Sequence, residues 1–320
     1  MTEIERYLTE EVVLDHADGH ISRREALHRL ALLGLGATTA GAMLAGCAGD
    51  KPGDATAPGT TAPAGTGTSS APASSATASG SAAPAGPPPG AATALPGLAI
   101  TFPGPEGRTL QGAWSGAPKP RGAVLIIHEN KGLNDHTRSL PGRFAGAGYS
   151  ALAIDLLSAE GGTASLGEPA NATAALSKVA PERFVADMRA GLDEIAKRAP
   201  GVKLGAIGFC FGGGMTWRLV ASKDARVAAA APFYGPLPEG ADFTGSKAAV
   251  LGVFAERDAR VNATRDAAKA ALEKAGLPHE IVTYPNADHA FFNDAGPRYS
   301  AETAAQAWSK VLEWFGRHLG

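Results

Sequence analysis

The chain has 320 residues, of which 44% are hydrophobic and 19% charged, and its formal net charge at pH 7 is −2. A balance so close to neutral gives no basic field of the kind on which nucleic-acid binding depends, so nucleic-acid partners are discounted. The sequence has no Cys/His cluster with zinc-ligand spacing and no G-x-x-x-x-G-K-[ST] phosphate loop. Neither a metal nor another cofactor is therefore implied.

Residues 1–47 are typical of a bacterial export leader. Ser22-Arg23-Arg24-Glu25-Ala26-Leu27 precedes the apolar run Leu30–Ala45, which is the order of a twin-arginine signal, although Ala26 stands where phenylalanine is frequent. Leu44-Ala45-Gly46-Cys47 resembles a lipobox, in which the cysteine receives lipid. We therefore expect lipidation at Cys47 and a protein anchored by lipid to the outside of a bacterial membrane.

Two features of the leader remain open. The alternative to an export signal is an ordinary N-terminal helix whose arginine pair is solvated, although the apolar run is too short and too often interrupted by glycine and threonine for a comfortable membrane span. Residues 1–20 are acidic and helix-prone, and the sequence assigns them no function.

Residues 48–94 consist almost wholly of Ala, Pro, Gly, Ser and Thr. Such a segment lacks the apolar side chains whose burial could offset the entropy of ordering, so we expect a disordered tether. A flexible linker of this length spans several nanometres, which would hold the following domain clear of a membrane.

Residues 95–320 contain alternating strand-like and helix-like patterns, which predict one α/β domain. After the first two strands, each strand is followed by a helical pattern, and this order favours a mostly parallel sheet with helices on both faces. The clearest helices are Pro181–Arg198 and about Ala301–His318, each with an apolar stripe at helical spacing. The expected strands are Leu98–Phe102, Thr109–Trp114, Ala123–Ile127, Tyr149–Ile154, Lys203–Ile207, Val227–Ala231, Ala248–Phe254 and Glu280–Tyr284.

The sequence Gly208-Phe209-Cys210-Phe211-Gly212 predicts a nucleophile elbow in which cysteine takes the place of serine. It follows a predicted strand and precedes a helix-like segment, Gly213–Ala221. A side chain presented on so sharp a turn requires strained backbone angles and small neighbours two residues away on either side. The alternative is a tight turn around a buried cysteine that has no chemical role.

Two residues further along the chain complete a candidate triad with Cys210. Asp258 follows a predicted strand, and His289 lies in a loop after another, so nucleophile, acid and histidine occur in the order that α/β-hydrolases use. Singly, each has an ordinary alternative, because an Asp after a strand is commonly a turn former or helix cap and a lone His is commonly structural. In this order, His289 would share the proton of Cys210 and Asp258 would orient the imidazole.

These motifs resemble the dienelactone hydrolases (carboxymethylenebutenolidases), and the resemblance extends from about Leu95 to Gly320. It implies the α/β-hydrolase fold for this domain. His128-Glu129-Asn130 is a further match. The resemblance implies that Glu129 acts as a gate that holds the resting cysteine unreactive until substrate displaces it. It also implies that the backbone N–H groups of Phe211 and Asn130 bind the oxyanion.

One departure from the family concerns the substrate. Lactone-cleaving members hold the substrate carboxylate with arginines, one of them shortly after the histidine, where this chain reads Phe291-Phe292-Asn293-Asp294. Arg138, Arg143 and Arg298 are the nearby alternatives, and the sequence does not place any of them in the cleft.

We therefore expect a hydrolase of small esters or lactones that acts through a thioester acyl-enzyme on a small-molecule substrate. The rival from another class is a non-catalytic, envelope-anchored binding module on the same fold, and peptidase activity is a weaker third candidate. Oligomeric state, physiological substrate and the membrane that holds the anchor do not follow from the sequence.

Overall fold

The computed structural model describes residues 1–46 and 87–320. Cys47 and residues 48–86 of the expected tether lie outside the described residues, so the predicted lipidation site has no structural description.

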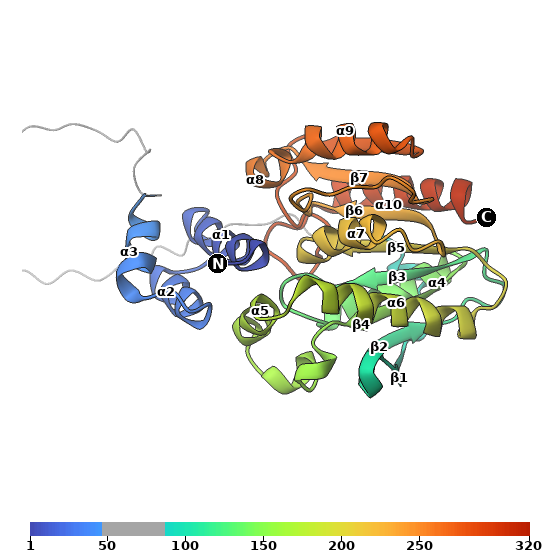
Figure 1. Ribbon diagram of the computed structural model, residues 1–320, viewed down its shortest axis with the longest axis horizontal. Helices are drawn as coiled ribbons and strands as arrows, with labels where there is room; N and C mark the ends of the chain where they lie inside the picture. The colour runs from blue at the N-terminus through green and yellow to red at the C-terminus, as the bar shows by residue number, and fades with distance from the viewer. Residues whose placement is uncertain (47–86) are drawn as a thin grey trace, which may run out of the picture.

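The described residues contain an eight-stranded sheet with the order β1-β2-β4-β3-β5-β6-β7-β8 (Figure 1). β1 pairs antiparallel with β2, and β2 pairs antiparallel with β4, while every other neighbouring pair is parallel. The expected α/β-hydrolase fold with a mostly parallel sheet is thus confirmed. The strand bounds are β1 Leu98–Pro103, β2 Thr109–Ser115, β3 Gly122–Ile127, β4 Tyr149–Asp155, β5 Leu204–Phe209, β6 Val227–Phe233, β7 Ala249–Ala255 and β8 His279–Tyr284.

The central strands are apolar and buried along their whole length, as parallel strands covered on both faces must be. Alternate residues of β3 face opposite helix layers. A Cβ built at Gly122 would lie 2.7 Å from Leu319 Cβ, whereas Leu125 lies against Gly191 of α6 (Pro181–Arg198) on the other face. The sheet is therefore the middle of three layers.

One layer holds α4 (Asp135–Gly146) and α10 (Ala301–His318), which meet where the rings of Phe144 and Trp308 lie 4.6 Å apart. The other holds α6 and α7 (Phe211–Ala221), whose Phe184 and Phe211 rings pack edge to face. The remaining helices of this domain are α5 (Pro169–Ser177), α8 (Ala259–Asn262) and α9 (Arg265–Ala275).

The domain begins a few residues before the expected boundary at Leu95. A 3-10 turn at Ala91–Thr93 packs on α4, where a Cβ at Gly146 would lie 2.0 Å from the Thr93 carbonyl oxygen. Leu95 N–H donates to the Gly142 carbonyl. The last residues of the composition-defined linker are thus part of the domain, since their alanines fit against a helix built with glycines.

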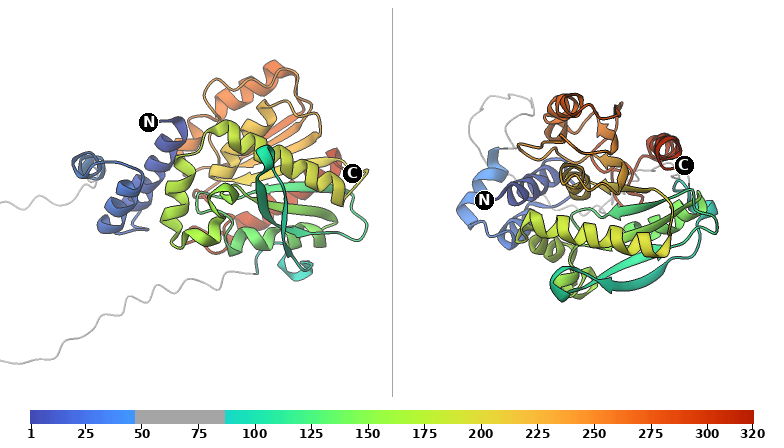
Figure 2. Two further views of the ribbon diagram at one scale, coloured as in Figure 1. Left: turned by 60° about the horizontal axis from the view of Figure 1, so that its bottom comes forward. Right: turned by 45° about the vertical axis from the view of Figure 1, so that its right-hand side comes forward.

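The N-terminal residues form three helices at the end of the sheet where the parallel strands finish (Figures 1 and 2). They are α1 (Glu3–Ala17), α2 (Arg23–Leu32) and α3 (Ala37–Gly46). The apolar run Leu30–Ala45 is therefore divided between two short helices, and in the described parts of the chain no helix combines the length and apolarity that a bilayer crossing needs. The arginine pair, Arg23 and Arg24, lies exposed in the first turn of α2.

Candidate active site

Cys210 occupies a sharp turn between β5 and α7, with φ 55° and ψ −118°. A positive φ is strained for a residue with a Cβ, and such strain persists only where the surroundings impose it. Here the Cys210 N–H donates to the Phe233 carbonyl, and the Cys210 carbonyl accepts from the N–H groups of Gly213 and Gly214. The predicted elbow is present, and it presents the thiol at the start of a helix.

Two glycines explain why the turn can close. A Cβ at Gly208 would lie 2.1 Å from the Gly212 carbonyl oxygen, and a Cβ at Gly212 would lie 2.4 Å from the Ile127 carbonyl oxygen. These are backbone atoms that cannot move aside, so both positions require glycine for space.

Asp258 and His289 lie together, as their order in the sequence predicted. His289 Nδ1 is 2.5 Å from Asp258 Oδ2, and the other oxygen of Asp258 accepts from the Val261 N–H at the start of α8. Asp258 is therefore a helix cap and the partner of the histidine at once. Ala290, next to His289, has φ 62°, so the loop that carries the imidazole is also strained.

Cys210 completes the group, and all three side chains are buried. The sulfur of Cys210 and a ring nitrogen of His289 lie within 4.8 Å of each other. Cys210 is 3% exposed and His289 is 9% exposed, and His289 Nε2 has no hydrogen-bond partner among the described residues. The imidazole thus has one nitrogen held by a carboxylate and the other free on the side of the thiol.

His128 and Glu129 follow β3, on the same edge of the sheet. His128 Nε2 accepts from the Leu156 N–H, so its Nδ1 carries the proton and donates to the Glu129 carbonyl at 2.7 Å. Burial lowers the pKa of His128, which matches a neutral imidazole that ties two strand ends together. The Glu129 carboxylate accepts from Asn293 Nδ2 at 2.6 Å and from the Tyr234 hydroxyl at 3.5 Å, rather than from the thiol.

The backbone N–H groups of Phe211 and Asn130 lie next to the nucleophile and next to Glu129 along the chain. Within the described residues, neither N–H donates a hydrogen bond to another backbone group. Phe211 is the first residue of α7, where a helix leaves N–H groups without an internal partner. Both groups are thus free to bind an oxygen that bears developing charge.

Helix α1 lies directly over the thiol, which the sequence gave no reason to expect. The Tyr7 hydroxyl is 3.2 Å from Cys210 Sγ, and Glu11 Oε1 is 3.6 Å from His289 Nε2. Tyr7 and Glu11 are four residues apart and so share one face of the helix.

Arg260 and Arg298 surround the Glu11 carboxylate. Arg260 forms an ion pair with Glu11, donates to the Tyr7 carbonyl at 2.9 Å and lies 4.1 Å from the centroid of the Tyr7 ring. Arg298 Nη1 is 3.9 Å from Glu11 Oε1. Arg298 thus reaches the edge of the site, while the other two arginines considered from the sequence do not: Arg143 pairs with Asp294, and Arg138 donates to the Leu133 carbonyl.

The donor atoms of Glu11, Cys210 and His289 lie within 4.8 Å of one another and are of the types that bind zinc. Arg260 and Arg298 already neutralise the carboxylate of this group, so its charge is committed to ion pairs. The arrangement therefore gives no separate reason to place a metal there.

While α1 is docked, the acidic neighbours of His289 favour its protonated form. Burial alone would lower its pKa, but the negative charges of Glu11, Asp258 and Cys210 outweigh burial and raise the pKa of His289 well above its usual value. The same contacts lower the pKa of Glu11 against the effect of burial.

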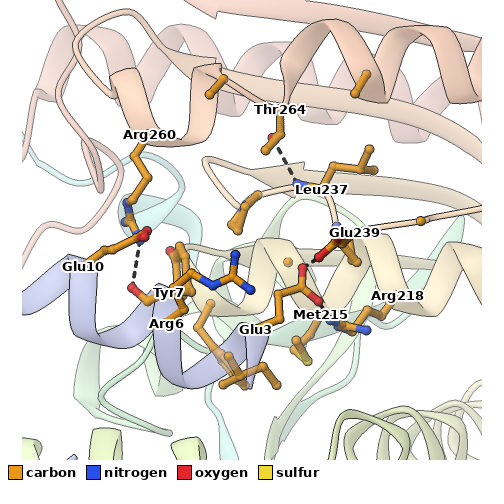
Figure 3. A pocket seen from close by; sticks show the side chains of 18 residues that line it. Glu3, Arg6, Tyr7, Glu10, Met215, Arg218, Leu237, Glu239, Arg260 and Thr264 are labelled. Carbon is orange, nitrogen blue, oxygen red and sulfur yellow. Dashed lines mark hydrogen bonds and ion pairs between the residues drawn. The ribbon is translucent and has the colours of Figure 1, made fainter. Parts of the chain in front are cut away.

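A cavity of about 410 Å³ lies between α1 and the catalytic domain (Figure 3). Tyr7 and Arg6 form part of its wall from the helix, and Met215, Leu237 and Arg260 approach from the domain. The cavity also borders Phe211, the residue after the candidate nucleophile. Space thus remains between α1 and the domain next to the elbow.

Sequence reasoning missed Tyr7, Glu11, Arg260, Tyr234 and Asn293. A signal existed for Arg260, which follows Asp258 by two residues on the same strand-end loop, and for Asn293, four residues after His289. No local pattern marked the residues of α1, since an acidic helix ordinarily faces water.

Comparison with known proteins agrees with the fold. The model of the Dienelactone hydrolase family matches residues 110–319. A protein of Methylorubrum extorquens named "Putative carboxymethylenebutenolidase" is 33% identical over 221 residues, which are 63% of this chain and 74% of that protein. Its namesake in Escherichia coli K12 is 29% identical over 71% of this chain and 87% of its own length.

Solved structures give the same answer. The crystal structure titled as a putative dienelactone hydrolase from Klebsiella pneumoniae is 29% identical, with a TM-score of 0.60, and the match covers 70% of this chain and all of that one. A dienelactone hydrolase-like promiscuous phosphotriesterase from metagenomic libraries shares the fold at 23% identity and a TM-score of 0.58. The chain belongs to the dienelactone hydrolase family and is a hydrolase of the α/β-hydrolase fold.

Proposed function

We propose that the protein hydrolyses small esters or lactones with Cys210 as the nucleophile. The observation that carries this proposal is the thiol on a strained elbow within 4.8 Å of a ring nitrogen of His289, a histidine whose Nδ1 is held by Asp258. A base positioned beside a thiol and oriented by a carboxylate is the arrangement that nucleophilic catalysis requires.

In this mechanism, His289 takes the proton of Cys210, and the thiolate attacks the carbonyl carbon of the substrate. The carbonyl electron pair moves to oxygen, where the N–H groups of Phe211 and Asn130 are in place to donate. Collapse of this intermediate breaks the ester C–O bond, and His289 returns the proton to the leaving oxygen. Water then attacks the thioester, which releases the acid and restores the thiol.

We assign Glu129 the role of a gate on Cys210. Glu129 is buried on the same edge of the sheet, and its carboxylate contacts the Tyr234 hydroxyl. Burial is the main cause that raises the pKa of Tyr234 well above its usual value, and Glu129 and Cys210 raise it further. A small rotation would bring the carboxylate from Asn293 toward the thiol, where it would compete with His289 for the proton.

Substrates with good leaving groups are favoured. In the tetrahedral intermediate, the thiolate of Cys210 is itself a good leaving group. When the other leaving group is poor, such as the amine of a peptide, the intermediate expels the thiolate and returns to the reactants. Peptides are therefore disfavoured. Relatives are named for carboxymethylenebutenolide, and dienelactone is the natural first substrate to test. The non-catalytic alternative is not favoured, because the elbow, the His–Asp pair and the free N–H groups are all retained.

We also propose that the mature enzyme is exported and lipid-anchored through Cys47. The exposed arginine pair and the small residues before Cys47 support this location. Growth in labelled palmitate, followed by comparison of the chain with its Cys47→Ser variant in membrane and soluble fractions, tests it. Label in the Cys47→Ser variant would contradict it.

The activity is tested by hydrolysis of dienelactone and p-nitrophenyl acetate. Because α1 covers Cys210, the chain is folded intact and then cleaved at a protease site placed within residues 60–70, and its leader is removed in high salt. We expect turnover that Cys210→Ala abolishes and an acyl-enzyme whose mass matches a thioester. If both esters are untouched while the thiol reacts freely with iodoacetamide, the proposed activity is wrong.

A further inference from the structure

Helix α1 is docked on the catalytic face through an amphipathic stripe. Ile4, Tyr7, Leu8 and Glu11 recur at helical spacing, and the three apolar side chains among them join the main hydrophobic core of the catalytic domain. Burial of apolar side chains is the dominant favourable contribution to most such contacts. This is a packed interface rather than a helix resting on the surface.

Charge complementarity runs along the whole helix. Residues 1–18 carry six carboxylates and one arginine. Arg218 of α7 pairs with Glu3 near one end, Arg260 of α8 pairs with Glu11 in the middle, and Arg298 pairs with Asp15 and Asp18 at the other end. Three separate elements of the domain thus present arginines in register with the acids of one helix.

The docked helix occupies the positions that a reaction needs. A carbonyl carbon must come within about 3–3.5 Å of the attacking atom, and the Tyr7 hydroxyl holds that place at 3.2 Å from Cys210 Sγ. Glu11 faces His289 Nε2 at 3.6 Å, which is the nitrogen that would exchange a proton with the thiol. No ester can reach the sulfur while Tyr7 and Glu11 are in place.

The catalytic domain does not need α1 for its family fold. The family match begins at residue 110, and the Klebsiella pneumoniae structure is fully covered by 70% of this chain. Helix α1 also precedes Cys47, so cleavage at the expected lipidation site would separate it from the domain.

We propose that the catalytic face is a docking site for the acidic helix of residues 1–18 of this same chain, and that the docked helix is an inhibitory pro-segment. It closes Cys210 during synthesis and export and is lost with the leader, so the enzyme becomes active only after processing. This inference rests on the proposed cysteine mechanism and on cleavage before Cys47.

The competing interpretation makes α1 a permanent wall of the substrate cavity. The cavity beside Phe211 is bordered by Arg6 and Tyr7, so a helix that stayed in place could shape it (Figure 3). The two interpretations predict opposite changes in activity. Weakening the helix contact raises activity if α1 is a pro-segment and lowers it if α1 completes the site.

The first experiment measures how fast iodoacetamide labels Cys210 in the full chain on a Cys47→Ser background, where Cys210 is the sole thiol. Glu11→Lys places a cation between Arg260 and Arg298 and removes the partner of a buried charge. Since breaking such a pair is strongly destabilising, we expect labelling to accelerate at least about tenfold. Ester hydrolysis should rise with it.

The matched control is Glu10→Lys, which makes the same charge change on the neighbouring residue. Glu10 has no ion pair among the described residues, so this variant should label at nearly the parent rate. Equal acceleration by both variants would mean that charge alone loosens the chain, and the docking proposal would be wrong.

A second experiment does not depend on a substitution. The chain with the protease site in residues 60–70 is cleaved after folding, its leader is removed in high salt, and a synthetic peptide of residues 1–18 is added back. We expect labelling and hydrolysis to rise on separation and to fall again with the peptide but not with its Glu11→Lys form. The pro-segment proposal would be wrong if separation left the labelling rate unchanged. It would also be wrong if separation exposed the thiol but abolished hydrolysis, and the added peptide restored hydrolysis.

The two proposals fail in different ways. If separation exposes the thiol and the peptide closes it again, while no ester is hydrolysed at any stage, then the docking site stands and the esterase assignment fails. If hydrolysis is equally fast before and after separation, the esterase assignment stands and the inhibitory role fails.

Discussion

The catalytic domain and the helix that covers it are held by different forces. Inside the domain, the strands β3, β5 and β7 are apolar and fully buried, and Glu129, Cys210 and Asp258 follow their ends. At the interface with α1, a short apolar stripe is supplemented by ion pairs to Arg218, Arg260 and Arg298. Apolar burial is insensitive to salt, whereas partly exposed ion pairs are screened by it. The catalytic domain is therefore a permanent fold, whereas α1 is a cover that can detach from it.

The largest expected effect belongs to the domain. Asp258→Asn would leave His289 buried without the carboxylate that fixes its tautomer, and we expect kcat/KM of the leader-free enzyme to fall by about 10⁴-fold. The pH dependence of kcat/KM for both forms checks the cause, because the loss should persist at every pH between 6 and 9. A loss of less than tenfold would show that Asp258 serves only as the cap of α8.

Gly208→Ala tests the packing of the elbow. A Cβ there would meet the Gly212 carbonyl oxygen at 2.1 Å, so we expect the free energy of unfolding in urea to fall by about 3 kcal/mol. Gly276→Ala is the control, since it has φ 65° and no atom within 4 Å, and it should cost about 1 kcal/mol. Equal losses at the two positions would contradict the account of the elbow.

The stability of the contact between α1 and the catalytic domain is expected to depend on pH. A raised pKa of His289 stabilises the covered form at pH values below the usual His pKa of about 6.5, and this contribution is lost as the pH rises through the folded-state pKa. Glu11→Gln removes the largest of the raising charges, so the His289 pKa should fall. NMR titration of the imidazole in the two full-length chains checks this, and an unchanged pKa would place Glu11 away from the ring.

The smallest effect is expected at the rim of the interface. Arg218→Ala removes a partly exposed pair with Glu3, which is worth about 0.2–1 kcal/mol, so Cys210 labelling should accelerate by no more than about fivefold. Raising the salt from about 0.1 M to 1 M, which shortens the Debye length from about 10 Å to 3 Å, should accelerate labelling of the parent and reduce the difference from the variant.

The sequence predicted the domain well, because its signals are local and strong. Each of the eight expected strands is present, the ends of α6 agree with the predicted helix, and the glycines around Cys210 correctly indicated the elbow. What it could not predict is the contact made by α1. An acidic helix and arginines on three separate elements of the domain are each unremarkable alone, and only the fold shows that their charges face one another.

The site residues likewise divide into those that the sequence predicted and those that it could not predict. Asp258 and His289 could be placed from their positions after strands, but Tyr7 and Glu11 could not, since no local pattern in α1 connects them to the thiol. The linker boundary was displaced for a similar reason: Ala91–Thr93 look like the preceding low-complexity residues, and only the surface of α4 makes them ordered.

The burial of Cys210 beneath Tyr7 also concerns oxidation. A thiol that is 3% exposed is out of reach of peroxide, whereas an uncovered, histidine-paired thiol is readily converted to a sulfenic acid. Residues 87–320 contain no second cysteine to form a disulfide with it and so make the damage reversible. The working life of the uncovered enzyme would then be set by how soon an oxidant reaches its one thiol, and this exposure begins when the helix leaves.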